Sequence, residues 1–173
     1  IVIPDFTYVE RNKDRIKGII ITHGHEDHIG GLAYLLSVVN KPVYGTPLTI
    51  GLIKGKLEEH GLLQSAELHE IEAGYRFKLG KFDIEAIHVN HSIPDALAFA
   101  LTTDVGTVIH SGDLKIDTTP VDGRMIDLAR FAELGKEGVL CYFADSTNAV
   151  KPGYSASESS VGDSFDRLFK AAG

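Results

Sequence analysis

The fold of this chain is organised around the stretch Thr22-His23-Gly24-His25-Glu26-Asp27-His28, which follows the apolar run Ile19-Ile20-Ile21. The apolar run predicts a buried strand over residues 18–21. Because an extended backbone has a period of two, His23 and His25 leave the strand end on the same side and can converge on one ion. If the chain then turns into a helix, Asp27 and His28 point to a neighbouring position that could hold a second ion. The pattern therefore indicates two metal ions.

An alternative interpretation treats these residues as solvated loop histidines, with Asp27 capping a helix that starts near Ile29. A single histidine would favour that alternative. Here three histidines and a carboxylate share one strand-to-helix corner, and the flanking glycines Gly24, Gly30 and Gly31 indicate close backbone packing. The corner therefore favours a metal site.

Composition places the chain among globular proteins with a substantial core. It has 173 residues, of which 43% are hydrophobic, and a mean hydropathy of +0.01. No apolar run approaches the roughly 20 residues that span a bilayer, and no secretory signal is evident, so no membrane partner is expected. The single cysteine, Cys141, lies in the apolar run 138–144, which predicts a buried packing residue. Because one cysteine cannot form an internal disulfide, a cytoplasmic location is expected.

The net charge of −7 argues against non-specific electrostatic binding to nucleic acid, because such binding depends on lysine and arginine. That count omits bound metals. Two divalent ions would add about four positive charges at one point and could dominate the local field. A substrate that carries a phosphate therefore stays compatible with the composition.

Hydrophobic periodicity predicts a mixed α/β chain. Helices are expected over residues 8–16, 29–39, 48–60 and 124–134, the last closed by Gly135. Strands are expected over residues 42–45, 68–71, 76–79, 81–89, 96–103, 107–110 and 138–144. Thr46 and Pro47 mark the start of the third helix, and residues 155–158 fit a capping box that opens a final helix.

Two further candidate ligands follow predicted strands. His91 comes after the strand 81–89, and Asp113 comes after the strand 107–110. Loops at strand ends of a layered α/β fold converge on one rim, where sites are built. In isolation His91 could equally be a loop histidine and Asp113 a turn residue. Together with the His23 corner, both become candidate metal ligands.

The remaining polar residues at strand ends and within strands are less specific. Asp145 ends the strand 138–144 and could orient a ligand or a catalytic histidine, or equally cap a turn. Packing or solvent exposure is the expected role of the other four histidines, His60, His69, His88 and His110. Of these, His110 could also orient a metal ligand without binding the metal itself.

The order and approximate spacing of these motifs resemble the metallo-β-lactamase superfamily. The resemblance rests on the corner from His23 to His28, the lone His91 and the run Ser111-Gly112-Asp113. A narrower resemblance, to the ribonuclease J family of the β-CASP branch, rests on longer sequence segments. These are Thr22 to Gly31, His91-Ser92-Ile93-Pro94-Asp95, Ser111-Gly112-Asp113-Leu114-Lys115 and Ala144-Asp145-Ser146-Thr147-Asn148.

The resemblance implies an α/β fold, a metallo-β-lactamase-type αββα sandwich with the metal site at one edge. Residues 1–152 would form a partial metallo-β-lactamase domain that lacks its first strands and its closing part. Residues 153–173 would begin an inserted β-CASP domain. The chain starts without Met and ends just after an amphipathic segment, so a fragment of a longer protein is expected.

The resemblance also implies a division of the ligands between two zinc ions. His23, His25 and His91 would hold one zinc. Asp27, His28 and Asp113 would hold the other, with Asp113 bridging both. Asp145 matches an acidic motif that supports a histidine contributed later in the chain. Asp27 and Asp145 are the candidate catalytic residues. Manganese could replace zinc in such a mixed site.

The expected function is a zinc-dependent ribonuclease that hydrolyses RNA phosphodiester bonds through a hydroxide bridging two zinc ions. Its substrate would be RNA, cleaved as a 5′-exonuclease, an endonuclease or both in RNA processing and decay. The full-length protein is expected to be a cytoplasmic homo-oligomer. Two alternatives stay open: a small-molecule (thio)ester hydrolase of the same fold, and a non-catalytic fragment. The strand end at Asp145 followed by a capped helix favours the nuclease.

Overall fold

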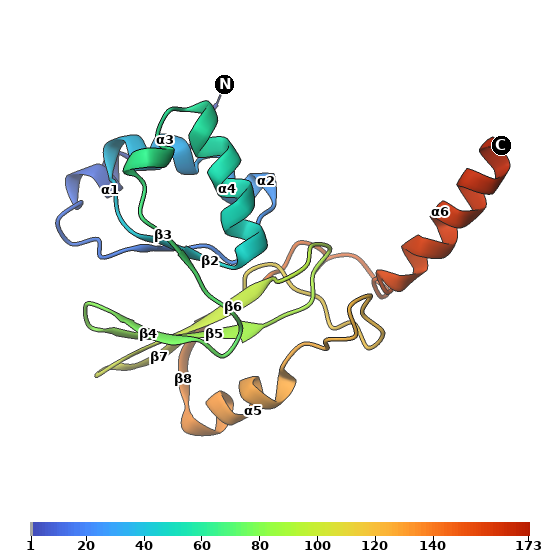
Figure 1. Cartoon of the computed structure of the whole chain (residues 1–173). Helices are drawn as coiled ribbons and strands as arrows, with labels where there is room; N and C mark the ends of the chain where they lie inside the picture. Colours follow the sequence, from blue (N-terminus) through green and yellow to red (C-terminus); the bar gives the residue numbers. More distant parts are fainter. Residues whose placement is uncertain (1) are drawn as a thin grey trace.

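Two β-sheets lie face to face between two groups of helices in the computed structural model, which describes residues 2–173 (Figure 1). The first helical layer contains α1 (Thr7–Arg11), α2 (Glu26–Ile29), α3 (Leu32–Val38), α4 (Pro47–Glu59) and the 3-10 helix η1 (Leu63–Ser65). On the other side, α5 (Leu128–Glu137) covers the second sheet, and α6 (Ser159–Ala172) projects away from both sheets. The four layers agree with the predicted αββα sandwich.

The two sheets differ in strand direction. The first is parallel, in the order β1 (Ile19–Ile20), β2 (Val43–Gly45) and β3 (Leu68–Glu70). The second follows chain order through β4 (Arg76–Leu79), β5 (Phe82–His88), β6 (Leu97–Thr103), β7 (Gly106–His110) and β8 (Val139–Phe143). Its pairs are antiparallel except β7 with β8, which is parallel. All predicted strands are present, with bounds within two residues of the prediction.

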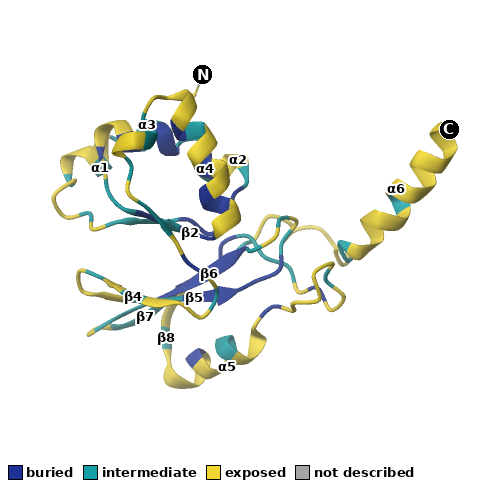
Figure 2. Cartoon of the chain, in the orientation of Figure 1, coloured by how far each residue is buried: buried dark blue, intermediate teal, exposed yellow. Residues whose placement is uncertain are grey.

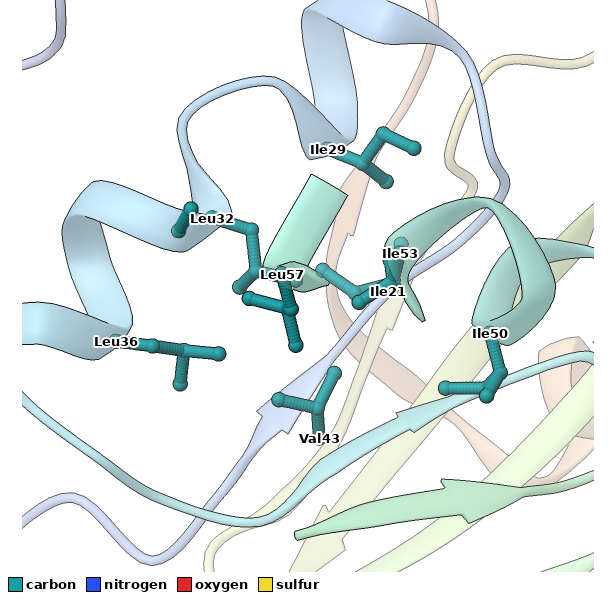
Figure 3. Close-up of a cluster of buried hydrophobic side chains, with 9 residues drawn as sticks. Ile21, Ile29, Leu32, Leu36, Val43, Ile50, Ile53 and Leu57 are labelled. Atoms are coloured by element: carbon teal, nitrogen blue, oxygen red, sulfur yellow. The ribbon is translucent and has the colours of Figure 1, made fainter. Parts of the chain in front are cut away.

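The first helical layer is held to the first sheet by one apolar cluster. Ile50, Ile53 and Leu57 recur at helical spacing along α4 and are at most 1% exposed, because that face of the helix packs on Val43 of β2. Figure 3 shows these side chains converging with Ile21, Ile29, Leu32 and Leu36. Each fully buried aliphatic side chain contributes roughly 1.5–3 kcal/mol. This cluster fixes the strand end from which the histidine corner emerges.

The second sheet buries both of its faces at β6 by alternating large and small residues. The large side chains Leu97 and Phe99 face the first sheet, where Ile20 and Tyr44 pack against the same cluster. The alanines on the other face point toward α5: Ala98 and Ala100 of β6, and Ala96 directly before it. Figure 2 shows β5 and β6 as the most buried strands of this sheet. Because successive side chains of a strand point to opposite faces, β6 contributes to the clusters on both sides of its sheet.

The helix predicted over residues 124–134 is wrong at both ends. α5 begins after Asp127, whose side chain accepts a hydrogen bond from the Arg130 backbone N–H at 3.0 Å. It runs through Gly135 and ends at Gly138, which has a φ of 102°. Residues 124–126 are not helical because the Arg124 carbonyl and the Ile126 N–H bond instead to the side chain of Asn90, two residues after β5.

The helix predicted over residues 29–39 is divided in two. α2 starts at Glu26, directly after His25, which has extended backbone angles (φ −66°, ψ 152°). α3 starts after Gly31. Asp27 therefore does not cap a helix that begins near Ile29, because it already lies inside α2. The helix predicted over residues 8–16 is also shorter than expected, since α1 ends at Arg11.

The capping box predicted at residues 155–158 is not formed as expected. α6 begins at Ser159, and Ser155 caps nothing. The Ser157 hydroxyl accepts from the Ser159 N–H at 3.2 Å, while Asp117 accepts from the Glu158 N–H at 3.0 Å. The start of α6 is therefore set by a carboxylate from a distant loop. The predicted start at Thr46 is correct in position, but its hydroxyl donates to the Thr49 hydroxyl at 2.9 Å.

The prediction that Cys141 is a buried packing residue is wrong. Cys141 is exposed, as are its neighbours Leu140, Tyr142 and Phe143. The reason is that β8 is the edge strand of the five-stranded sheet and pairs only with β7 among residues 2–173. Apolar character alone does not bury a strand that no other element covers. In the same described part of the chain, every helix is too short or too polar to cross a membrane.

Candidate metal centre

The histidine corner is built by the end of β1 and the start of α2. The Ile21 N–H donates to the Tyr44 carbonyl at 2.9 Å, and the Thr22 carbonyl accepts from the Leu97 N–H at 2.8 Å. These bonds keep the backbone extended past the assigned strand and tie it to both sheets. His23 and His25 therefore sit two residues apart on extended backbone, while His28 is presented by the first turn of α2.

Two glycines allow the corner to be approached closely. A Cβ at Gly24 would lie 2.6 Å from Leu52 Cδ1 of α4. Gly112 has a φ of 59°, and a Cβ there would lie 2.8 Å from Thr22 Cβ. The Leu52 side chain is exposed and can turn away from a Cβ at Gly24, whereas the positive φ and the Thr22 Cβ leave no room at Gly112. Glycine at position 112 therefore lets the loop after β7 reach the corner. That approach brings Asp113 beside the histidines.

Five of the six predicted ligands lie together. Two groups of donor atoms, each within 4.8 Å of one another, share His23: one is His23, His25 and His91, and the other is His23, His28 and Asp113. His91 Nε2 lies 3.1 Å from His25 Nδ1 and 3.8 Å from Asp113 Oδ2. His28 Nε2 lies 3.4 Å from the same Asp113 oxygen. The arrangement can hold two adjacent cations, with Asp113 facing both positions.

His23 lies at the centre of the cluster and is fully buried. Its Nδ1 atom is 3.0 Å from the Thr22 hydroxyl. Its Nε2 atom is the only buried side-chain nitrogen or oxygen without a hydrogen-bond partner in residues 2–173. Such atoms are rare because burial without a partner is costly. A metal ion would satisfy this nitrogen.

The cluster favours neutral imidazoles, the form that binds metal. Burial, together with the nearby rings of His28, His91 and His25, lowers the pKa of His23 to about 4. Burial and His25 also lower the pKa of His91. Near neutral pH the lone pairs of both residues are therefore available to a cation.

Asp27 is the predicted ligand that stands apart. Its Oδ2 lies 3.7 Å from His28 Nε2, its side chain is 79% exposed, and it belongs to neither donor group. Asp27 therefore lies at the rim of the cluster, next to the position shared by His28 and Asp113. Ligation by Asp27 stays a prediction.

Asp145 braces the loop that carries Asp113. Its Oδ2 accepts from the Leu114 N–H at 3.3 Å, and its Oδ1 accepts from the Thr147 N–H at 2.9 Å and the Thr147 hydroxyl at 2.8 Å. Burial acts to raise the pKa of Asp145, but these hydrogen bonds outweigh it and the pKa lies below its usual range. Asp145 thus both caps a turn and contacts the residue after a candidate ligand.

The other four histidines lie outside both donor groups. His69 contacts Glu67 at 2.7 Å, and His60 packs against the ring of Tyr34. His88 Nε2 lies 3.2 Å from the Arg124 carbonyl. The Nδ1 atom of His110 accepts from the Gly112 N–H at 3.1 Å, so this residue supports the turn before Asp113.

Sequence reasoning missed two buried polar residues next to the ligands. The Ser111 hydroxyl accepts from the Asp145 N–H at 2.9 Å, and Ser111 is fully buried. Asn90 is 6% exposed and precedes His91. The available signal was a polar side chain directly after a run of apolar strand residues, a position that usually demands a hydrogen-bond partner.

A cavity of about 600 Å³ opens beside the cluster. His91 lies in its wall, together with the residues that follow it, part of the loop 117–122 and the start of α6. Its apolar wall includes Ile93, Pro94, Val121 and Val161. The cavity could receive part of a substrate whose reacting group lies at the ligands.

Comparison with known families finds that the model described as "Beta-lactamase superfamily domain" matches residues 4–131. Among curated proteins, the chain is 50% identical over 173 residues to a ribonuclease J of Helicobacter pylori, covering 99% of this chain and 25% of that protein. It is 48% identical over 174 residues to a ribonuclease J of Synechocystis, covering 99% and 27%. The chain thus spans about a quarter of the length of these relatives.

Among solved structures, the chain is similar to a protein of unknown function from Enterococcus faecalis, with a TM-score of 0.56 and 15% sequence identity. The match covers 82% of this chain and 34% of that chain. At this identity the similarity concerns the fold alone, and it supports the layered arrangement described above.

Proposed function

Because this chain belongs to the β-lactamase superfamily, we propose that it carries the metal centre of a ribonuclease that hydrolyses RNA phosphodiester bonds. The similarity to proteins named ribonuclease J, at 48–50% identity over nearly the whole chain, supports RNA as the substrate. The activity belongs to the full-length protein, of which this chain would be the metal-binding part.

The unpartnered Nε2 atom of buried His23 is the observation that carries the proposal. A nitrogen buried at the junction of two donor groups fits a metal ligand, and imidazoles with a carboxylate are ligands that zinc accepts. We assign His23, His25 and His91 as the residues that would hold one zinc, and Asp27, His28 and Asp113 as those that would hold the other, with Asp113 shared between the two. Manganese is the alternative metal. When bound, two such ions supply an activated water and positive charge for phosphate oxygens.

The protein's own residues would prepare this site in distinct ways. Low pKa values keep His23 and His91 unprotonated, so protons compete weakly with the metal. Asp145, through its contact with the Leu114 N–H, would hold the Asp113 loop against the corner. The cavity beside His91 would receive the part of the RNA next to the scissile phosphate.

The finer expectations extend the same proposal. Residues 1–152 would be part of the metallo-β-lactamase domain, and residues 153–173 the start of an inserted β-CASP domain. The projection of α6 away from both sheets is consistent with this boundary. The full-length protein would act in the cytoplasm as a homo-oligomer, as a 5′-exonuclease, an endonuclease or both.

The test compares the full-length protein with its His25→Ala and Asp113→Ala variants, using end-labelled RNA and elemental analysis of bound metal. We expect both variants to lose bound metal and to cleave RNA at least 100-fold more slowly. The matched control is His60→Ala, which removes a histidine outside the cluster and should change neither quantity. Unchanged metal content and cleavage in both site variants would refute the assignment. Turnover of a thioester without RNA cleavage would favour a small-molecule hydrolase.

A further inference from the structure

The buried side chain of Asn90 joins the end of β5 to a distant segment. Its Nδ2 donates to the Arg124 carbonyl at 2.7 Å, and its Oδ1 accepts from the Ile126 N–H at 2.8 Å. The carboxamide therefore satisfies a carbonyl and an N–H two residues apart, as the peptide group of a neighbouring strand would. Residues 124–126 are held along the end of β5 in this way.

The backbone of Asn90 forms a hydrogen bond with a different segment, the loop that carries Asp113. Its carbonyl accepts from the Lys115 N–H at 2.8 Å, in an antiparallel bridge between the two residues. Lys115 lies two residues after Asp113, a candidate ligand. Asn90 thus contacts the Asp113 loop through its backbone and residues 124–126 through its side chain, and the next residue in the chain is His91.

His91 depends on this backbone for its position. Its Nε2 points to His25 Nδ1 and Asp113 Oδ2, whereas no group of residues 2–173 forms a hydrogen bond with its Nδ1 atom. Metal-binding histidines are usually oriented by a partner on the second ring nitrogen. Apart from edge-on ring contacts with His23 and His25, the position of the ring therefore depends on the backbone that carries it.

Metal geometry sets a narrow tolerance on that placement. Ligand distances at a metal vary by only about 0.2 Å, so a strand end that shifts slightly would remove His91 from the site. The side chain of Asn90 prevents such a shift by fixing the strand end to residues 124–126, which lead into α5. It acts one residue away from the ligand without contacting the metal position.

We propose that Asn90 is a positioning residue, whose side-chain carboxamide sets the place of His91 relative to His25 and Asp113 in the metal centre. The inference rests on the proposed metal centre but not on the identity of the substrate. A purely structural role would require only that Asn90 stabilise the fold, and the two roles differ in what happens to metal affinity.

The test uses the full-length protein with Asn90→Leu and Asn90→Asp. Asn90→Leu keeps the branched shape of the side chain and loses both hydrogen bonds. Asn90→Asp keeps the acceptor for the Ile126 N–H and loses the donor to the Arg124 carbonyl, so it stays informative if the leucine variant does not fold. Zinc affinity is measured by chelator competition, and the ligand geometry by the absorption spectrum of the cobalt-substituted protein.

We expect each variant to bind zinc roughly 10–100-fold more weakly, as when the supporting partners of metal ligands are removed. The cobalt spectrum should also change in shape. One control is Asn40→Ala, which loses a side-chain bond to the Ser65 carbonyl far from the site. The other is Ile71→Ala, which removes a buried side chain from a core cluster other than the one that packs against the histidine corner. Both controls should keep the parent affinity and spectrum.

Parent zinc affinity and an unchanged cobalt spectrum in the Asn90 variants would overturn the proposal, whatever their thermal stability. Equal losses of zinc affinity in Ile71→Ala and the Asn90 variants would also overturn it, since general destabilisation would then be a sufficient cause. If the parent protein does not cleave RNA but the Asn90 variants still lose zinc affinity, the proposed function fails and the role of Asn90 stands.

Discussion

The Nε2 atom of His91 lies 3.1 Å from the Nδ1 atom of His25, although 66 positions separate the two residues in the chain. The first leaves the end of β5, and the second precedes α2. Two imidazole nitrogens at this distance can share one proton or face a common cation. The proximity of His23 Nε2, which has no hydrogen-bond partner, favours the cation.

The first prediction concerns the pair His25 and His91. His25→Ala and His91→Ala should each remove most of the bound metal and lower RNA cleavage at least 100-fold, because each loss leaves an incomplete ligand set. The double variant should be no more than about 10-fold worse than either single variant, since residues that act as a unit are not additive. Elemental analysis and single-turnover cleavage by the full-length protein measure this. If the fold-losses in cleavage rate of the two single variants multiply in the double variant, the two residues act independently.

The second prediction concerns pH and the metal-free protein. The pKa of His23 is about 4 in the folded state, below the ordinary histidine value near 6.5. Between these values the unfolded state binds more protons, so the free energy of unfolding should fall as pH is lowered from 6.5 to 4. Urea unfolding of the metal-free protein should show the fall, with a slope of up to about 1.4 kcal/mol per pH unit from this residue.

His23→Gln is the control for the pH experiment, because glutamine does not titrate. Its stability should depend less on pH over this interval than that of the parent protein. An identical pH dependence in both proteins would assign the effect to other groups.

The third prediction tests the close approach at Gly112. Gly112→Ala should lower the free energy of unfolding by about 1–3 kcal/mol and weaken metal binding, because the new Cβ would collide with Thr22 at a φ of 59°. Gly123→Ala is matched in backbone strain, with a φ of 75°, but has open space around its Cβ. It should cost about 1–2 kcal/mol and leave metal affinity unchanged. Equal metal affinity in both variants would mean that the collision does not reach Asp113.

The fourth prediction concerns Asp145. Asp145→Ala should slow RNA cleavage and weaken metal binding, because it removes the acceptor for the Leu114 N–H beside Asp113. Thr147→Val removes only the hydroxyl contact of the Asp145 carboxylate and should have a smaller effect. The two variants are compared by zinc titration and cleavage rate. A larger effect for Thr147→Val would place the important contact in the turn and not in the Asp113 loop.

Much of the fold follows from local pattern. The strand over residues 76–79 was predicted with its correct bounds, and the other strands differ by one or two residues, because a period of two is visible in a short window. Thr46 and Pro47 likewise predicted the start of α4. Two of the errors concern elements whose ends depend on distant partners. Residues 124–126 bond to Asn90 and not to a helix, and α6 starts where Asp117 accepts its N–H.

The sequence by itself determined the chemistry of the candidate centre. Histidines two residues apart on an extended strand end must lie on the same side, so the first half of the donor set is a local property of residues 23–28. Only the tertiary structure decided which distant residues join it, that Asp27 stays at the rim, and that Cys141 is exposed. These features depend on close approach and coverage between segments far apart in the chain. Local pattern does not encode such distances, because they arise from the packing of whole layers.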